Sequence, residues 1–256
     1  MALSAHARPI PGAVATLGVS DRVDFLRKTY AHLGVTLVVW AALTAYLMRT
    51  EFSLKFTMWA LGSGSRLNWL LVIGLFMVVG IVAEKLARSE SSRGLQYAGL
   101  GLAAIGEAIL LQPLLWLVII KFGNPQDFIA GVDGGMGMGG RVIMEAALIT
   151  VAIFVGLTAT VFITRKDFSF MRGALSIGMF AVLGVIIASM IFGFHLGAIF
   201  SGAVILLMAG YILYQTSVIM RDFPPTAHVA ASLMLFSTIA TLFWYVLRLV
   251  MSLRSD

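Results

Sequence analysis

The feature that most limits the fold is a run of 47 residues, 174–220, that contains no charged side chain. As one helix this run would be about 70 Å long, more than twice the roughly 30 Å of a bilayer's hydrocarbon core. It must therefore form two membrane spans. The segment GFHLG at 193–197 is the only turn-like break in the run, so we expect the two spans to meet there.

Five other apolar segments have similar lengths, which predicts an all-α membrane protein with seven transmembrane helices. The expected spans are 30–48, 69–86, 95–120, 142–164, 174–194, 197–220 and 229–251. Of all residues, 60% are hydrophobic and 12% are charged, whereas charged residues make up about a quarter of a soluble domain. The composition therefore excludes a soluble fold, and the net charge of +6 is interpreted as membrane topology, with no nucleic-acid partner.

The chain before the first span is expected to be a tail followed by a short helix. Residues 1–19 are rich in Ala, Gly and Pro and lack apolar periodicity, which predicts a mobile tail. They also lack the apolar stretch of a cleavable signal peptide. Asp21 can cap an amphipathic helix, DRVDFLRKTY, which we expect to lie at the membrane surface with Val23, Leu26 and Tyr30 on one face.

These segments give the expected domain organisation and orientation. Residues 1–29 form a cytoplasmic tail with the short amphipathic helix, 30–251 form the seven-helix transmembrane domain, and 252–256 are a short tail. If the amino terminus is cytoplasmic, the inner side holds eleven of the 18 Lys and Arg residues and the outer side holds seven. This excess favours a cytoplasmic amino terminus and an external carboxyl terminus.

Polar side chains inside the spans are the candidate functional residues, because polar groups are costly in lipid. Gln215 lies in the sixth expected span, and Ser237 and Thr238 lie in the seventh at comparable depth, close enough for a hydrogen bond between the helices. Such a bond is either structural, worth about 0.6 kcal/mol, or an altered permeation site that binds an ion through neutral oxygen atoms. Glu107 in the third span either serves an ion pathway or stays protonated and bonds a neighbour.

Other polar patterns indicate structure rather than chemistry. The glycine-rich segment at 131–140 is expected to be a flexible outer loop, and Glu145 is expected to pair with Arg141 one helical turn earlier. The four histidines have no spacing typical of metal ligands, and cysteine is absent. We find no nucleophile with a base, no metal cluster and no cofactor motif, which predicts a protein that is not an enzyme.

Three motifs occur in order along the chain: RKTY at 27–30, TRKDFSF at 164–170 and YILYQTS at 211–217. Together with the spans between them, they resemble the Bax inhibitor-1 family over residues 25–248. The resemblance implies two groups of three helices around a central seventh helix. It also assigns Arg165, Lys166 and Asp167 to a family motif in the loop between the fourth and fifth spans.

The chain differs from many members of the family at two positions, one in the sixth span and one in the seventh. Those members look like YILYDT in the sixth span and LYLD in the seventh, two aspartates thought to gate a pH-sensitive calcium leak. Here the first position is Gln215, and the second is Ser237 or Thr238, depending on the alignment. Glutamine, serine and threonine do not titrate as a carboxyl pair does, so that pH switch is expected to be absent.

The resemblance leaves two functional hypotheses. The pattern is closer to a bacterial branch that resembles modulators of a membrane-anchored ATP-dependent protease. We therefore expect a multi-pass protein of the bacterial inner membrane that regulates quality control or the stress response, with residues 1–19 as the segment that the protease engages. The alternative is a leak for Ca²⁺ or another cation with altered or absent pH gating.

Overall fold

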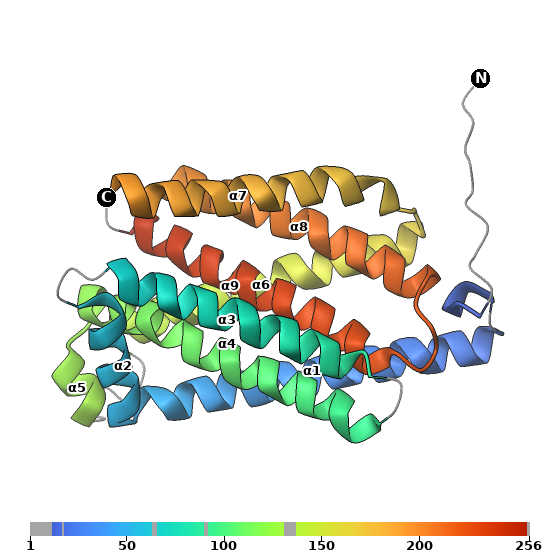
Figure 1. Ribbon diagram of the computed structural model, residues 1–256, viewed down its shortest axis with the longest axis horizontal. Helices are drawn as coiled ribbons and strands as arrows, with labels where there is room; N and C mark the ends of the chain where they lie inside the picture. The colour runs from blue at the N-terminus through green and yellow to red at the C-terminus, as the bar shows by residue number, and fades with distance from the viewer. Residues whose placement is uncertain (1–11, 17, 63–65, 90–91, 131–136, 255–256) are drawn as a thin grey trace.

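The structure, a computed structural model, describes residues 12–16, 18–62, 66–89, 92–130 and 137–254. Within these ranges, seven helices are long and apolar enough to cross a membrane, which confirms the expected fold class (Figure 1). They are α1 (Val19–Met48), α3 (Arg66–Ala87), α4 (Arg93–Phe122), α6 (Met138–Thr164), α7 (Arg172–Phe192), α8 (Ala198–Arg221) and α9 (His228–Leu253). The break between the two spans of the uncharged run lies where expected, since Gly193 ends α7 in the left-handed conformation with φ 78°.

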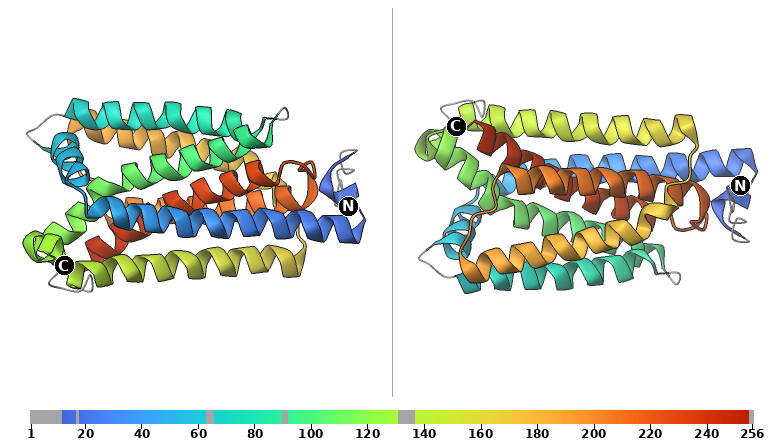
Figure 2. Two further views of the ribbon diagram at one scale, coloured as in Figure 1. Left: turned by 90° about the horizontal axis from the view of Figure 1, so that it is seen from below. Right: turned by 90° about the horizontal axis from the view of Figure 1, so that it is seen from above.

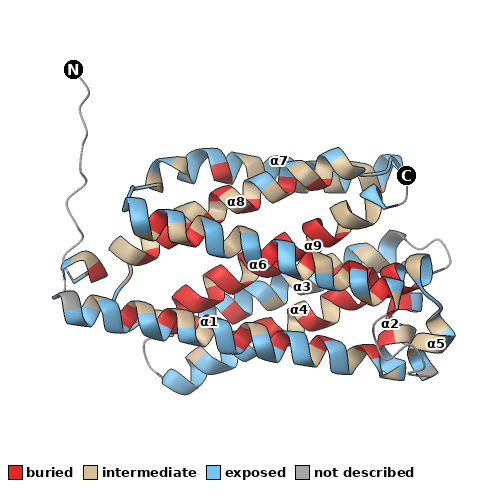
Figure 3. Cartoon of the chain, turned by 180° about the vertical axis from the view of Figure 1, so that it is seen from behind, coloured by how far each residue is buried: buried red, intermediate tan, exposed pale blue. Residues whose placement is uncertain are grey.

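The seven spans pack as two groups around α9 (Figure 2). The helices α1, α3 and α4 form one group and α6, α7 and α8 the other, while α9 contacts members of both. In the most apolar window of α9, 67% of the residues are buried inside the bundle, against 6% for α7. Figure 3 shows the same contrast, with α9 largely buried and α7 exposed at the edge. The central seventh helix implied by the family resemblance is therefore present.

Two faces of the bundle are named for the helix ends that they carry. The amino-terminal face carries the start of α1 and the connections α3–α4, α6–α7 and α8–α9. The carboxyl-terminal face carries the end of α9, the α7–α8 turn and the short helices α2 (Glu51–Leu61) and α5 (Pro125–Ala130). Neither short helix was predicted, because 11 and 6 residues are too few to span the hydrocarbon core.

The beginning of the chain differs from the expected tail and surface helix. The helix α1 runs without a break through 30 residues, so the amphipathic segment and the first span are one element. Its buried face carries Phe25, Thr29 and Leu33, whereas Val23, expected on one apolar face with Leu26 and Tyr30, is 58% exposed. Of the three residues expected on one face, Leu26 and Tyr30 pack against the core and Val23 does not, because the segment packs inside the bundle rather than on a flat membrane surface.

Part of the predicted mobile tail is ordered against the bundle. Residues Val14–Thr16 form a 3₁₀ turn, η1, and the side chains of Ala13 and Val14 are buried. The Val14 amide donates a hydrogen bond of 2.9 Å to the carbonyl of Phe223, in the α8–α9 turn. Arg22 donates to the carbonyl of Ala15 at 2.7 Å and holds the turn against α1. Residues 1–11 of the expected tail lie outside the described residues.

Two further expectations need correction at the carboxyl-terminal face. Glu145 does not pair with Arg141; both of its carboxylate oxygens accept from Arg254, at 2.5 and 2.6 Å. Arg254 comes from the end of α9, so the bond joins α6 to the central helix. In the glycine-rich segment, residues 138–140 belong to α6, while 131–136 lie outside the described part of the chain.

Candidate functional site

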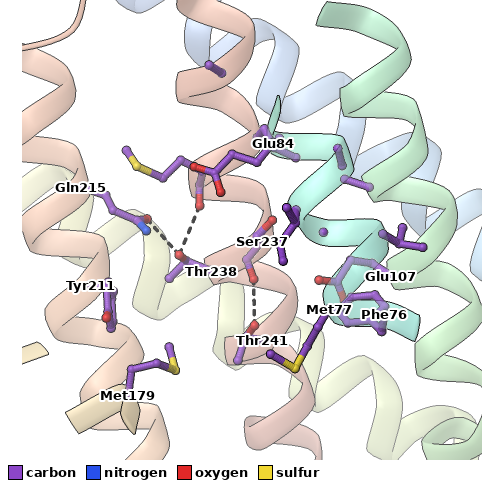
Figure 4. Close-up of a pocket in the computed structure, with 18 of the residues that line it drawn as sticks. Phe76, Met77, Glu84, Glu107, Met179, Tyr211, Gln215, Ser237, Thr238 and Thr241 are labelled. Carbon is purple, nitrogen blue, oxygen red and sulfur yellow. Dashed lines mark hydrogen bonds between the residues drawn. The ribbon is translucent and has the colours of Figure 1, made fainter. Parts of the chain in front are cut away.

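The candidate site is a cavity of about 470 Å³ inside the bundle. Its walls come from α3, α4, α7, α8 and α9, and it occupies the middle of the bundle and extends toward the amino-terminal face (Figure 4). Gln215, Ser237, Thr238 and Glu107, the four residues singled out in the sequence as ion-pathway candidates, all line it. The fold thus brings together side chains from three helices that are far apart in the chain.

The polar pair between α8 and α9 joins Gln215 to Thr238. The Thr238 hydroxyl lies 2.9 Å from Gln215 Oε1, to which it donates a hydrogen bond, and 3.2 Å from the carbonyl of Met234. Ser237, the other candidate, makes no side-chain bond to Gln215; its carbonyl accepts from the hydroxyl of Thr241 at 2.9 Å (Figure 4). Gln215 and Thr238 are both buried, whereas Ser237 is half-buried and faces the cavity.

Glu107 stands on the opposite wall, beside Phe76 and Met77 (Figure 4). No hydrogen bond or ion pair joins its carboxyl group to another side chain in the described ranges. Both expected roles of Glu107, an ion pathway and a protonated group bonded to a neighbour, stay predictions. A carboxyl group that faces a cavity without a protein partner is available to water, protons or a cation.

An ion pair marks the end of the cavity near the amino-terminal face. Glu84 lies near the end of α3 and Arg88 directly follows this helix. Arg88 Nη2 lies 2.9 Å from Glu84 Oε1, and both residues line the cavity. Arg88 and Ala230 also line a second cavity of about 720 Å³ between the ends of α3, α4, α8 and α9. Because the two cavities share Arg88 and Ala230 as wall residues, they adjoin each other near the amino-terminal face.

Aromatic side chains pack beyond the other end of the cavity. Trp69 of α3 stacks on Trp244 of α9, with ring centroids 6.2 Å apart. Trp244 lies about one helical turn beyond Thr241, the cavity residue closest to the carboxyl-terminal face on α9. Nearby, Arg248 donates to the carbonyl of Leu196 at 2.9 Å and ties α9 to the α7–α8 turn. Trp69 and Trp244 thus pack between Thr241 and the carboxyl-terminal face.

The family motif at Arg165, Lys166 and Asp167 lies outside the cavity. Arg165 ends α6 in the left-handed conformation with φ 50°, and Lys166 is exposed. Asp167 accepts from the Ser169 amide at 2.8 Å and forms an ion pair with Arg221 of α8. The motif therefore fastens the α6–α7 connection to the end of α8.

Two polar clusters escaped the sequence reasoning because their members are distant in the chain. At the amino-terminal face, the rings of His32 and His228 lie 5.0 Å apart, and His32 Nε2 lies 3.1 Å from the Tyr97 hydroxyl. The His32 Nδ1 atom donates to the carbonyl of Lys28 at 2.7 Å. Among the residues that the structure describes, no group of three or more His, Cys, Asp or Glu side chains is placed to hold a metal ion.

The second cluster joins α2 to α4 near the carboxyl-terminal face. Ser53, fully buried on α2, donates to Gln112 Oε1 at 2.7 Å and accepts from Trp116 Nε1 at 2.7 Å. Gln112 also donates to the carbonyl of Ala108 at 2.7 Å. This network explains the glutamine that follows Glu107 in the third span: its role is to anchor α2, and it does not line the cavity.

Comparison with known proteins gives one family and several relatives. The sequence profile of the family described as inhibitor of apoptosis-promoting Bax1 matches residues 22–255. An uncharacterized protein of Pseudomonas aeruginosa is 36% identical over 110 residues, which cover 43% of this chain and 49% of that protein, about half its length. Bax inhibitor 1 of Schizosaccharomyces pombe is 27% identical over 249 residues, which cover 95% of this chain and 82% of the relative. The Golgi anti-apoptotic protein of vaccinia virus is 25% identical over 244 residues, covering 93% and 89%.

Proposed function

Because the chain belongs to the Bax inhibitor-1 family, a family of multi-pass membrane proteins, we propose that it is a cation leak of the bacterial inner membrane and that the Glu107 cavity is its pathway. The observation that carries the proposal is the carboxyl group of Glu107, which faces a cavity inside the membrane domain without a hydrogen-bonding partner among the described side chains. The sequence favoured a protease regulator, but the cavity gives the leak the stronger physical support.

The proposed route begins at the amino-terminal face, which we place in the cytoplasm. A cation enters the outer of the two cavities, passes the Glu84–Arg88 pair and reaches Glu107. Carboxylate, amide and hydroxyl oxygens, which Glu107, Gln215 and Ser237 supply, are the ligands that Ca²⁺ prefers. For the ion to continue, the Trp69–Trp244 stack has to separate, so this contact is the proposed gate.

Such a leak would lack the family's carboxyl-pair switch. The bond between Gln215 and Thr238 joins two groups that do not titrate, so it keeps its form at every physiological pH. Any pH dependence of the flux must therefore come from another group, and Glu107 is the first candidate because it is the carboxyl group in the middle of the pathway.

The test is calcium flux into liposomes that contain the purified protein, at pH 6 and pH 8. We expect Glu107→Gln to reduce the flux at least about tenfold, since it removes the charge that offsets the ion's lost hydration. Glu145→Gln is the matched control, because Glu145 pairs with Arg254 outside the cavity. A natural protein that passes no ion, or a Glu107→Gln variant with unchanged flux and pH profile, would overturn the proposal.

A second candidate is regulation of a membrane-anchored ATP-dependent protease. It is favoured by the docking of Val14 on the α8–α9 turn, which places the beginning of the described chain on the face proposed to be cytoplasmic. Deleting residues 1–11 leaves this contact in place. We expect the deletion to abolish inhibition of the protease in reconstituted membranes and to leave calcium flux unchanged. Full inhibition of the protease by the protein that lacks residues 1–11 would show that this segment is not needed for regulation.

A further inference from the structure

The cavity around Glu107 is larger than an inorganic ion requires. Its volume of about 470 Å³ falls in the range of roughly 300–1,000 Å³ that is typical of sites for small molecules. A water molecule, by comparison, occupies about 30 Å³ in the liquid. The volume therefore indicates an occupant of the size of a small organic molecule, in addition to any ion that passes through.

The walls suit an apolar body of irregular shape. Four methionines, one from each of four helices, line the cavity: Met77 of α3, Met179 of α7, Met208 of α8 and Met234 of α9. Thioether side chains are flexible and polarisable, so surfaces rich in methionine accept ligands of varied shape. The rings of Phe76 and Tyr211 also line the cavity, and aromatic faces attract organic cations.

The cavity is also accessible from the side of the bundle. Three residues of its wall, Met77, Ile81 and Met179, are 50%, 53% and 39% exposed, although they lie on membrane-spanning helices. They come from α3 and α7, which belong to different groups of the bundle. The cavity therefore borders the lipid-facing side of the bundle between these two helices, and we infer that a molecule dissolved in the lipid enters there.

We propose that this cavity binds a lipophilic organic cation, a bulky ammonium or phosphonium whose charge lies against Glu107 and whose apolar groups lie among the methionines. Charge complementarity selects this occupant: an acyl chain would leave the carboxyl group unpaired, and an anion would be repelled. The site is independent of conduction, because a ligand can bind here whether or not ions pass the Trp69–Trp244 stack.

The experiment uses two probes of nearly equal size and opposite charge, tetraphenylphosphonium and tetraphenylborate. Binding to the full-length protein in lipid nanodiscs is measured at pH 8 by equilibrium dialysis, with binding to empty nanodiscs subtracted. We expect saturable binding of the cation and none of the anion. Glu107→Gln should lower the affinity for the cation at least about tenfold. Glu145→Gln, outside the cavity, should leave the affinity for the cation unchanged.

A second variant guards against misfolding of the first. Gly80 lines the cavity, and a Cβ atom added there meets no atom within 4 Å. We therefore expect Gly80→Leu to fold and its side chain to fill part of the cavity. This variant retains Glu107 but should bind the phosphonium with lower affinity. Equal affinity of the natural protein and both variants would overturn the proposal, and so would equal binding of the two probes, which would identify an apolar site for lipid chains. Calcium flux without phosphonium binding would refute this inference and leave the leak standing.

Discussion

Among single residues, Thr238 offers a direct measure of what a polar contact contributes inside this bundle. Replacing it with Val removes the hydrogen bond to Gln215 and conserves the shape of the side chain. We expect the free energy of unfolding to fall by about 0.6 kcal/mol, the average for such bonds between membrane helices, and by no more than about 1.7 kcal/mol. Thr238→Ser should retain the bond and most of the stability. Reversible unfolding in mixed detergent micelles measures both.

Ser237 supplies the control for this prediction. Its hydroxyl makes no bond to Gln215, so Ser237→Ala should change the unfolding free energy less than Thr238→Val. If the order is reversed, Ser237 rather than Thr238 is the partner of Gln215 in solution.

Ser53 is expected to contribute more to stability than Thr238, because its hydroxyl forms hydrogen bonds with two buried partners. Ser53→Ala leaves Gln112 Oε1 and Trp116 Nε1 without it, and each unsatisfied buried polar group costs about 1–3 kcal/mol. Since two groups lose their partner, we expect a loss of stability of about 2–6 kcal/mol and a shift in tryptophan fluorescence from the altered surroundings of Trp116. Thr50→Ala, which removes only a local bond to the carbonyl of Leu47, is the matched control. Equal free energies of unfolding for the two variants would contradict the proposed contribution of this network to stability.

The sequence predicted the depth of these polar side chains in the spans, but it did not predict which of them form hydrogen bonds or ion pairs with one another. Depth in a span can be counted from the regular rise of a helix, so Gln215 and the Ser237–Thr238 pair were placed at the same level. One residue is a rotation of about 100° about the helix axis, however, and only packing decides which of two neighbours faces α8. Glu145 was paired with Arg141 for the same reason: local spacing was visible, and Arg254, 109 residues away, was not.

Among the elements, the η1 turn gives a testable account of how the chain's beginning is held. Val14 is fully buried, and its amide donates to the carbonyl of Phe223. Val14→Asp would bury a charge without a partner, so we expect the turn to detach and the amides of 12–16 to exchange with solvent faster. Hydrogen exchange with mass spectrometry measures this, with Ala15→Ser as the control. Unchanged protection in Val14→Asp would show that the turn is held by other contacts.

Long helices were predictable and short ones were not, and the difference is physical. A span of about 20 apolar residues is dictated by the thickness of the bilayer, whatever its neighbours are. Short helices depend on tertiary packing, because helix nucleation is unfavourable. The helix α2 exists where Ser53, Thr57 and Ala60 pack inward, and nothing in its own hydrophobicity distinguished it from a loop. The cavity was unpredictable for the same reason, since it is a property of five helices together.

For the whole molecule, the orientation in the membrane can be tested without removing any native thiol, because the chain contains no cysteine. Lys166→Cys lies on the amino-terminal face and Asn124→Cys on the carboxyl-terminal face, and both native side chains are exposed. From the excess of basic residues we expect a membrane-impermeant maleimide to label position 124 in intact cells and position 166 only in everted vesicles. Labelling in the reverse pattern would invert the proposed topology and the direction of the pathway.

The central position of α9 has a consequence for how the protein is made. The ribosome synthesises this helix after the other six spans, so α1, α3, α4, α6, α7 and α8 enter the membrane before the helix that fills their centre exists. Until then, the faces that will cover α9 must be occupied by lipid or by the insertion machinery. Assembly of the bundle is therefore completed by its last span, and a ribosome that stalls before α9 leaves the two groups of helices without the span that both of them contact.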